Sequence, residues 1–190
     1  MYHLYWSHRQ FQLEPVFERV TSFLGLFVMT GDPLSFARTH RWHHAHADTD
    51  LDTHSPVHGR FHSMIGWLFK KSPVNGVLIP DLTTEEFKYL KFLAREKIKL
   101  IWATLIVIAL ISREALLGLT LTMCIAFHLE MITNAFAHSP KTKSAMDVKI
   151  LAWLTFGVLH LGHHNNPGKI ERNDPGYLLI RSLRKLRLVR

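Results

Sequence analysis

The chain has 190 residues, 14 of them histidine, and a formal net charge of +8 with histidine counted as neutral. That length fits a single domain, residues 1–190, and one cysteine, Cys124, excludes an intrachain disulfide framework. The positive charge is typical either of nucleic-acid binding or of the basic flanks of a membrane protein. The second interpretation is favoured, and no nucleic-acid partner is expected, because the basic residues lie beside apolar segments rather than among aromatic ones.

The first third of the chain is predicted to hold two short helices. Residues 16–30 are apolar but too few for a full membrane span, so we expect a helix that lies at an interface or is buried in protein. Gly31 interrupts this run, and Asp32 followed by Pro33 is typical of an N-cap and a first helical position. The helix that they begin is expected to extend through residues 40–46.

The middle of the chain carries the apolar segments. The spacing Thr83-x-x-Glu86 predicts a capping box and a helix that becomes apolar at Ile98. A short polar turn then separates it from a second apolar stretch, and we predict a transmembrane hairpin over residues 98–133. The hairpin tip has few charges whereas the other ends carry many lysines and arginines, which predicts that every histidine cluster lies on the cytoplasmic side. Further helices are expected within residues 148–162 and in the basic tail, 173–190.

The histidines gather in three clusters: His3-x4-His8, His40-x2-His43-His44 and His160-x2-His163-His164, with Asn134-x3-His138 before the last. Imidazole is a common ligand of transition metals, and side chains at i, i+3 and i+4 share one face of a helix. The spacing of five between His3 and His8 suits a helix end whose last turn loosens. One triplet alone could be coincidence, but the whole set predicts a multi-histidine metal centre. So many imidazoles exceed a closed zinc site and suit two metal ions with open positions, as in O2 chemistry by non-haem iron.

The order of these motifs resembles that of the membrane fatty acid desaturases of the stearoyl-CoA, or delta-9, type. The similar segments span most of the chain: HLYWSHRQF (3–11), TGDPLSFARTHRWHHAHADTDLDTHSP (30–56), SMIGWLFKK (63–71), HLEMITNAFAH (128–138) and GVLHLGHHNNP (157–167). The resemblance implies an all-α integral membrane protein in which a cytosolic helical cap holds a di-metal site. It also implies two ferrous ions, with O2 as co-substrate.

The resemblance further implies the residues of the site. The expected iron ligands are His3, His8, His40, His43, His44, His138, His160, His163 and His164, with Asn134 binding through a water. Asp48, Asp50 and Asp52 are candidates for carboxylates that orient metal-bound imidazoles. Lys70 and Lys71 match a basic pair that meets the CoA head group, with Trp67 beside them, although a solvated basic turn explains the lysines equally well.

The implied reaction is the introduction of a double bond into a fatty acyl chain, carried by CoA or a lipid. No flavin, nicotinamide or haem motif occurs in the sequence, so the electrons are expected from a separate protein of the cytochrome b5, ferredoxin or rubredoxin type. Two alternatives stay open: a hydroxylase or other oxygenase on the same scaffold, and an inactive truncated desaturase.

The chain departs from the family pattern at several positions. The family places a membrane hairpin before its first histidine box, whereas this chain begins two residues before His3, so we expect it to lack that hairpin. Within the fourth motif Glu130 replaces a threonine and Met131 a tryptophan. A glutamate in an apolar helix is unfavourable unless it is paired or faces a site.

Overall fold

The computed structural model describes residues 2–47, 49–70, 74, 79–136, 138–139, 144–145, 149–154 and 175–189. Helices form nearly all of the regular structure in these ranges: a π-helix η1 (Tyr2–Ser7), α1 (Pro15–Leu24), 3-10 helix η2 (Gly25–Val28), α2 (Pro33–His46), η3 (Pro56–His58), α3 (Arg60–Met64), η4 (Gly66–Phe69), α4 (Thr84–Ile111), α5 (Arg113–Phe136), α6 (Lys149–Leu154) and α8 (Pro175–Lys185). The exception is a two-residue antiparallel pair, β1 (His138–Ser139) with β2 (Ser144–Ala145). The all-α prediction is therefore confirmed.

Side-chain caps set the starts of the main helices. The Asp32 carboxylate accepts from the Ser35 backbone N–H at 2.9 Å, and the Ser35 hydroxyl lies 3.2 Å from the Asp32 backbone N–H. The predicted capping box between Thr83 and Glu86 is present at the start of α4. Each box satisfies backbone donors that the first helical turn leaves unpaired.

The apolar run 16–30 does not form one helix. α1 ends at Leu24, and the tighter turn η2 follows it. At the junction, Gly25 lies against the ring of Tyr2, where a Cβ atom would overlap the ring. The Tyr2 hydroxyl donates to the Ser22 carbonyl at 2.9 Å, so this contact holds η1 against the end of α1.

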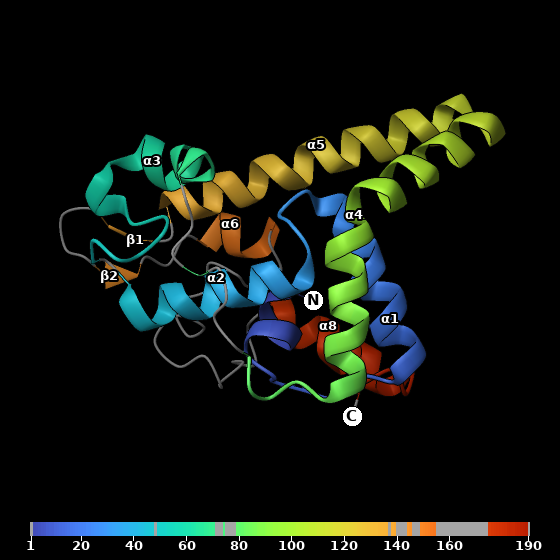
Figure 1. The fold of residues 1–190 in the computed structure, drawn as a ribbon, viewed down its shortest axis with the longest axis horizontal. Coiled ribbons are helices and arrows are strands. Elements are labelled where there is room, and N and C mark those ends of the chain that lie inside the picture. Colours follow the sequence, from blue (N-terminus) through green and yellow to red (C-terminus); the bar gives the residue numbers. More distant parts are fainter. Residues whose placement is uncertain are drawn as a thin grey trace.

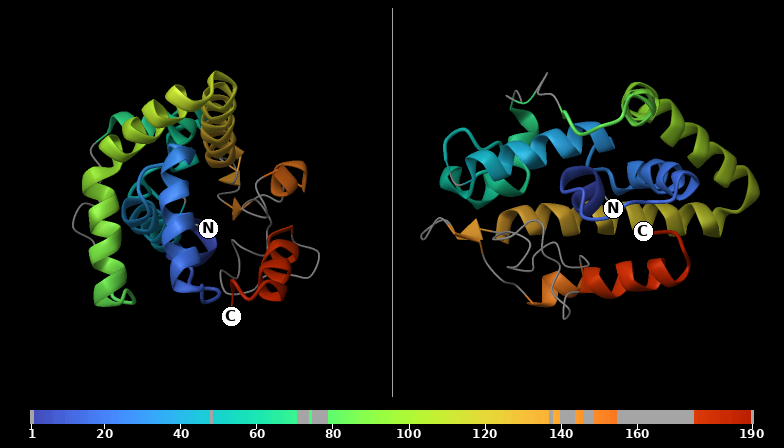
Figure 2. Two further views of the ribbon diagram at one scale, coloured as in Figure 1. Left: turned by 90° about the vertical axis from the view of Figure 1, so that its right-hand side faces the viewer. Right: turned by 90° about the horizontal axis from the view of Figure 1, so that it is seen from below.

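η1 lies at the centre of the core. Its Tyr2, Leu4, Tyr5 and Trp6 are buried against Leu34 and Ala37 of α2, Leu90 of α4 and Ile180 of α8. The Trp6 indole N–H donates to the Ser22 hydroxyl at 2.9 Å, and neither residue is exposed. The first segment of the chain is thus fixed by contacts with helices from all parts of the sequence, and Figure 2 shows it between α1, α2 and α8.

α4 and α5 pack together, and the end of α4 and the start of α5 project beyond the rest of the molecule (Figure 1). In the described part of the chain, α5 is the one helix long and apolar enough by itself to cross a membrane. The segments Pro15–Val28 and Pro33–His46 meet at an angle of 76°. They are long and apolar enough to cross a membrane only when the two are counted together as one span. α4 is not apolar over the length that a membrane span needs, because charges at Arg95, Glu96, Lys97 and Lys99 shorten its apolar run. The helical hairpin is present, but its prediction as a two-span transmembrane element is not confirmed.

Candidate metal centre

The π-helical turn η1 brings His3 and His8 onto one side. In a π-helix residue i bonds to residue i+5, and the His8 backbone N–H donates to the His3 carbonyl at 3.2 Å. Their ring centroids lie 4.8 Å apart with the planes nearly perpendicular. The spacing of five, which an α-helix would spread apart, therefore gives two neighbouring imidazoles.

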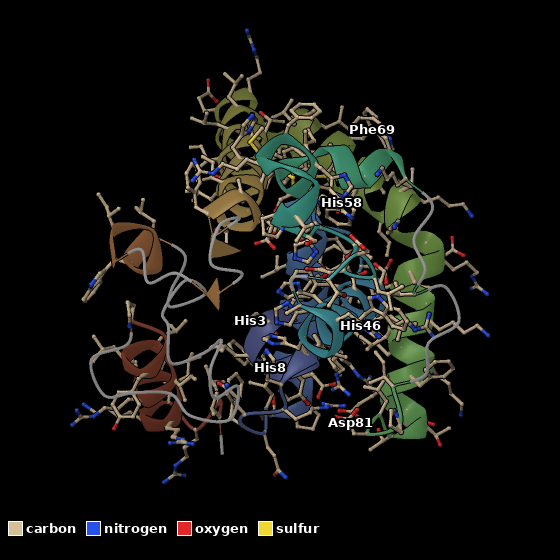
Figure 3. The ribbon with its side chains drawn as sticks, turned by 90° about the vertical axis from the view of Figure 1, so that its left-hand side faces the viewer. His3, His8, His46, His58, Phe69 and Asp81 are labelled. Carbon is tan, nitrogen blue, oxygen red and sulfur yellow. The ribbon has the colours of Figure 1, made fainter. Side chains whose placement is uncertain are left out.

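α2 supplies the opposing imidazoles. His40 Nε2 lies 2.9 Å from His8 Nε2 and 3.0 Å from His44 Nε2. One ring nitrogen from each of His3, His8, His40 and His44 falls within 4.8 Å of all the others. We call this set the four-histidine cluster. Figure 3 shows His3 and His8 close together on the N-terminal coil, whereas His58 and Phe69 lie apart from them, on η3 and η4.

The spacing of these nitrogens fits a shared metal ion. Metal–imidazole bonds are about 2.0–2.1 Å long, so two ligands at a right angle place their nitrogens about 3.0 Å apart. The two distances to His40 Nε2 have that value. Burial and the surrounding imidazoles of His3, His44, His8 and His43 hold the pKa of His40 well below its ordinary value. The ring is therefore neutral, as a metal ligand must be.

A second group lies next to the first and includes a carboxylate. Asp52 Oδ2 is 3.0 Å from His43 Nδ1, and Asp52 Oδ1 is 3.6 Å from His54 Nδ1. His43 and Asp52 are buried, and the rings of His43 and His54 stack at 4.4 Å. Burial alone would raise the pKa of Asp52, but the two histidines lower it more, so it stays ionised. His43 thus points to a different place from His40 and His44, because i+3 and i+4 diverge around the helix.

His54 is the residue that sequence reasoning missed. It ends the Asp50-x-Asp52-x-His54 pattern within the second family-like motif, but no role was expected of it. Of the three aspartates named as candidates, Asp52 contacts the histidines of this group. Asp50 is exposed and 3.9 Å from His58 Nε2 instead, and Asp48 lies outside the described residues.

A cavity of about 400 Å³ adjoins both groups. His40 of the first group, His54 of the second and Asn134 of α5 all line it. α5 is held there because the Ser63 hydroxyl of α3 donates to the Asn134 carbonyl at 2.6 Å, with Ser63 fully buried. Trp67 also lines the cavity, whereas Lys70 is exposed nearby in sequence.

The other expected site residues lie outside the described part of the chain or are described by their backbone alone. His160, His163, His164 and Lys71 lie outside the described residues. His138 is described only as part of the backbone of β1, directly after α5. The structure therefore brings together His3, His8, His40 and His44, and sets His43 and Asn134 beside them.

Several known proteins are similar in sequence to this chain. No family model matches the chain. It is 29% identical over 180 residues to a protein of Arabidopsis thaliana described as a probable chloroplastic lipid desaturase, covering 90% of this chain and 49% of that protein. It is 28% identical over 183 residues to an acyl-CoA C20 delta-5 desaturase of Anemone leveillei, covering 90% and 57%. It is 35% identical over 97 residues to delta-9 acyl-lipid desaturase 1 of Arabidopsis thaliana, covering 50% and 32%.

The first two similarities cover 90% of this chain but less than two thirds of either relative. The chain spans about half the length of the first two relatives named above. Its curated homologues are acyl-CoA and acyl-lipid desaturases, delta-9 desaturase-like proteins among them.

Proposed function

We propose that this chain is an O2-dependent fatty acyl desaturase of the delta-9, acyl-CoA type with a di-iron centre. The homologues support an oxidoreductase that acts on fatty acyl chains. The observation that carries the proposal is the spacing of the four-histidine cluster, in which nitrogens from the N-terminal segment and from α2 approach one another at the distances of ligands on one ion.

The proposed ligands divide between two ions. His3, His8, His40 and His44 would hold one, and His43 with His54 would face the other, with Asn134 binding through a water. Asp52 fixes the ring orientation and tautomer of His43, which is the usual task of a carboxylate behind a metal-bound imidazole. His138, His160, His163 and His164 complete the proposed set. Histidine sites with open positions suit non-haem iron.

The proposed reaction removes two hydrogens from adjacent carbons. One substrate, one O2, two electrons and two protons give one double bond and two waters. When bound, the iron pair supplies the oxidant that unactivated C–H bonds require. The chain's own residues would hold the substrate in the cavity that lies against His40 and Asn134. Trp67, Lys70 and Lys71 would hold the head group at its entrance, and a separate protein of the cytochrome b5, ferredoxin or rubredoxin type would deliver the electrons.

The proposal includes a membrane location. The hairpin 98–133 would insert into the bilayer with the histidines on the cytoplasmic side. Large apolar side chains are exposed along it, including Trp102, Leu110, Ile111, Leu117 and Leu121. Exposed apolar surface of this extent marks contact with lipid or protein, and a bilayer would cover it.

Iron content tests the centre. We expect about two irons per chain in detergent-purified protein, and a loss of one or both in His40→Ala. His128→Ala is the matched control, because among the described residues the His128 ring bonds within its own helix turn, to the Cys124 carbonyl at 2.7 Å and near the Cys124 sulfur. Mass spectrometry of the product then separates desaturation, which removes two hydrogens, from hydroxylation, which adds an oxygen. Iron content that does not differ between His40→Ala and the wild type would refute the assignment.

A further inference from the structure

Two opposite charges line the cavity beside the candidate metal centre. Arg38 comes from α2 and Glu130 from α5. The Arg38 Nε atom is buried and has no hydrogen-bond partner in the part of the chain that the structure describes. Over the described ranges, the Glu130 carboxylate also forms no hydrogen bond or ion pair. The cavity therefore holds a donor and an acceptor that no described residue meets with a hydrogen bond.

The surroundings make such unsatisfied groups unfavourable. Phe36, Phe127, Met131 and Leu68 also line the cavity, so much of its wall is apolar. A polar group in apolar surroundings lowers stability unless it has a hydrogen-bond partner, and an acidic residue on an apolar helix commonly marks a functional site. The missing partner is therefore expected on the molecule that fills the cavity.

Glu130 is placed to meet a substrate rather than a metal ion. Its carboxylate belongs to neither of the ligand groups defined by mutual distance, the four-histidine cluster and the His43–Asp52–His54 group. It lies four residues before Asn134 on α5, which is about 6 Å along the helix axis at a rise of about 1.5 Å per residue. An acyl chain lying against Asn134 would pass Glu130 a few carbon atoms away.

We propose that Glu130 and Arg38 make the chain selective for an acyl group that carries a hydroxyl a few carbons from the position that is oxidised. This inference rests on the proposed function. A hydroxyl both donates and accepts: its O–H donates to the Glu130 carboxylate, and its oxygen accepts from the Arg38 guanidinium. A plain methylene chain would leave both charges unsatisfied, and an ammonium or a carboxylate would match one of them only.

The expected selectivity follows from the strength of hydrogen bonds to charged groups. Such bonds contribute about 1.5–3 kcal/mol each, which is about 10- to 100-fold in binding. We therefore expect a suitably placed hydroxyl to improve binding at least about tenfold over the unsubstituted chain. Sites built to bond a hydroxyl discriminate strongly against the analogue that lacks it.

The test compares octadecanoic acid with a positional series of its monohydroxy derivatives, by competition binding to the full chain in detergent. The wild type should favour one or two neighbouring hydroxyl positions. Glu130→Val should abolish or reverse that preference, and Glu130→Gln, which keeps the shape, should weaken it. Glu114→Val is the matched control, because Glu114 is exposed at the start of the same helix and bonds to Ser112. It should leave the preference intact.

Three results would overturn the inference: equal binding of all ligands by the wild type, a preference that survives in Glu130→Val, or no binding of any acyl ligand. In a further outcome, the wild type shows no preference while the double variant, Glu130→Val with Arg38→Met, is more stable than either single variant. That result would show that the two charges pair with each other and would also overturn the inference. Iron content is measured on the same samples. Equal binding at full iron content removes this inference alone, whereas absence of iron removes the proposed function.

Discussion

Replacing Asp52 by alanine should weaken metal binding while the histidines themselves stay unchanged. The carboxylate lies 3.0 Å from His43 Nδ1 and 3.6 Å from His54 Nδ1, and its side chain is fully buried. Only the first distance is that of a normal hydrogen bond, so the effect is mainly that of freeing one imidazole. Loss of a carboxylate behind a metal-bound histidine reduces metal affinity about 10- to 100-fold, which is about 1.4–2.8 kcal/mol.

The assay is iron release to a competing chelator, measured for wild type, Asp52→Ala, Asp52→Asn and Asp50→Ala. Asparagine keeps an oxygen that accepts from His43 Nδ1, so Asp52→Asn should lose less than Asp52→Ala. Asp50 is exposed and belongs to neither ligand group, so Asp50→Ala should bind iron like the wild type. Thermal unfolding of the metal-free proteins separates a folding defect from a binding defect, because Asp52 also accepts from the His54 backbone N–H at 3.3 Å. Unchanged iron affinity in Asp52→Ala would refute the assigned role.

Two further predictions concern the fold around the centre. Gly25→Ala should lower the free energy of unfolding by about 1–3 kcal/mol, because the new Cβ would displace a core ring. Gly118→Ala is the control: its Cβ meets no neighbour within 4 Å, so it should be neutral or stabilising. Chemical denaturation of both variants checks this prediction. The Arg41 guanidinium bonds both oxygens of Asp81, at 2.6 and 2.8 Å, and this lowers the pKa of Asp81. The pair should therefore stabilise the fold above the ordinary aspartate pKa of about 3.9 and lose that effect as the pH falls through the lowered value. Asp81→Asn should accordingly lower the melting temperature at neutral pH and not in strong acid, and an equal effect at both would contradict the sign.

Local patterns in the sequence predicted the local parts of the site. The capping residues Asp32 and Thr83 and the face shared by His40 and His44 depend on residues within one or two helical turns. Such features are set by the chain's own near neighbours. They can be read from the sequence because no distant segment is needed to define them.

The features that the sequence did not predict depend on contacts between segments that are distant in sequence, or on the full length of an apolar run. His54 reaches His43 only because the loop after α2 folds back, and nothing in the spacing of the two residues requires this. The bond from Ser63 to the Asn134 carbonyl joins segments 71 residues apart. The two-span hairpin stays a prediction: among the described helices α5 alone is long and apolar enough by itself, because charges from Arg95 to Lys99 shorten the apolar run of α4.

The π-helical turn at the N-terminus combines an unfavourable backbone geometry with close packing in the core. Residues Tyr2–Ser7 adopt a π-helical geometry, which is rare and appears mostly as single turns, often at functional positions. Deleting one residue between His3 and His8 would allow an ordinary α-helical turn with better backbone geometry. The same deletion would remove one of Leu4, Tyr5, Trp6 and Ser7, all of which are buried. Making this segment regular would therefore remove core contacts that hold the backbone of His3 and His8 in place.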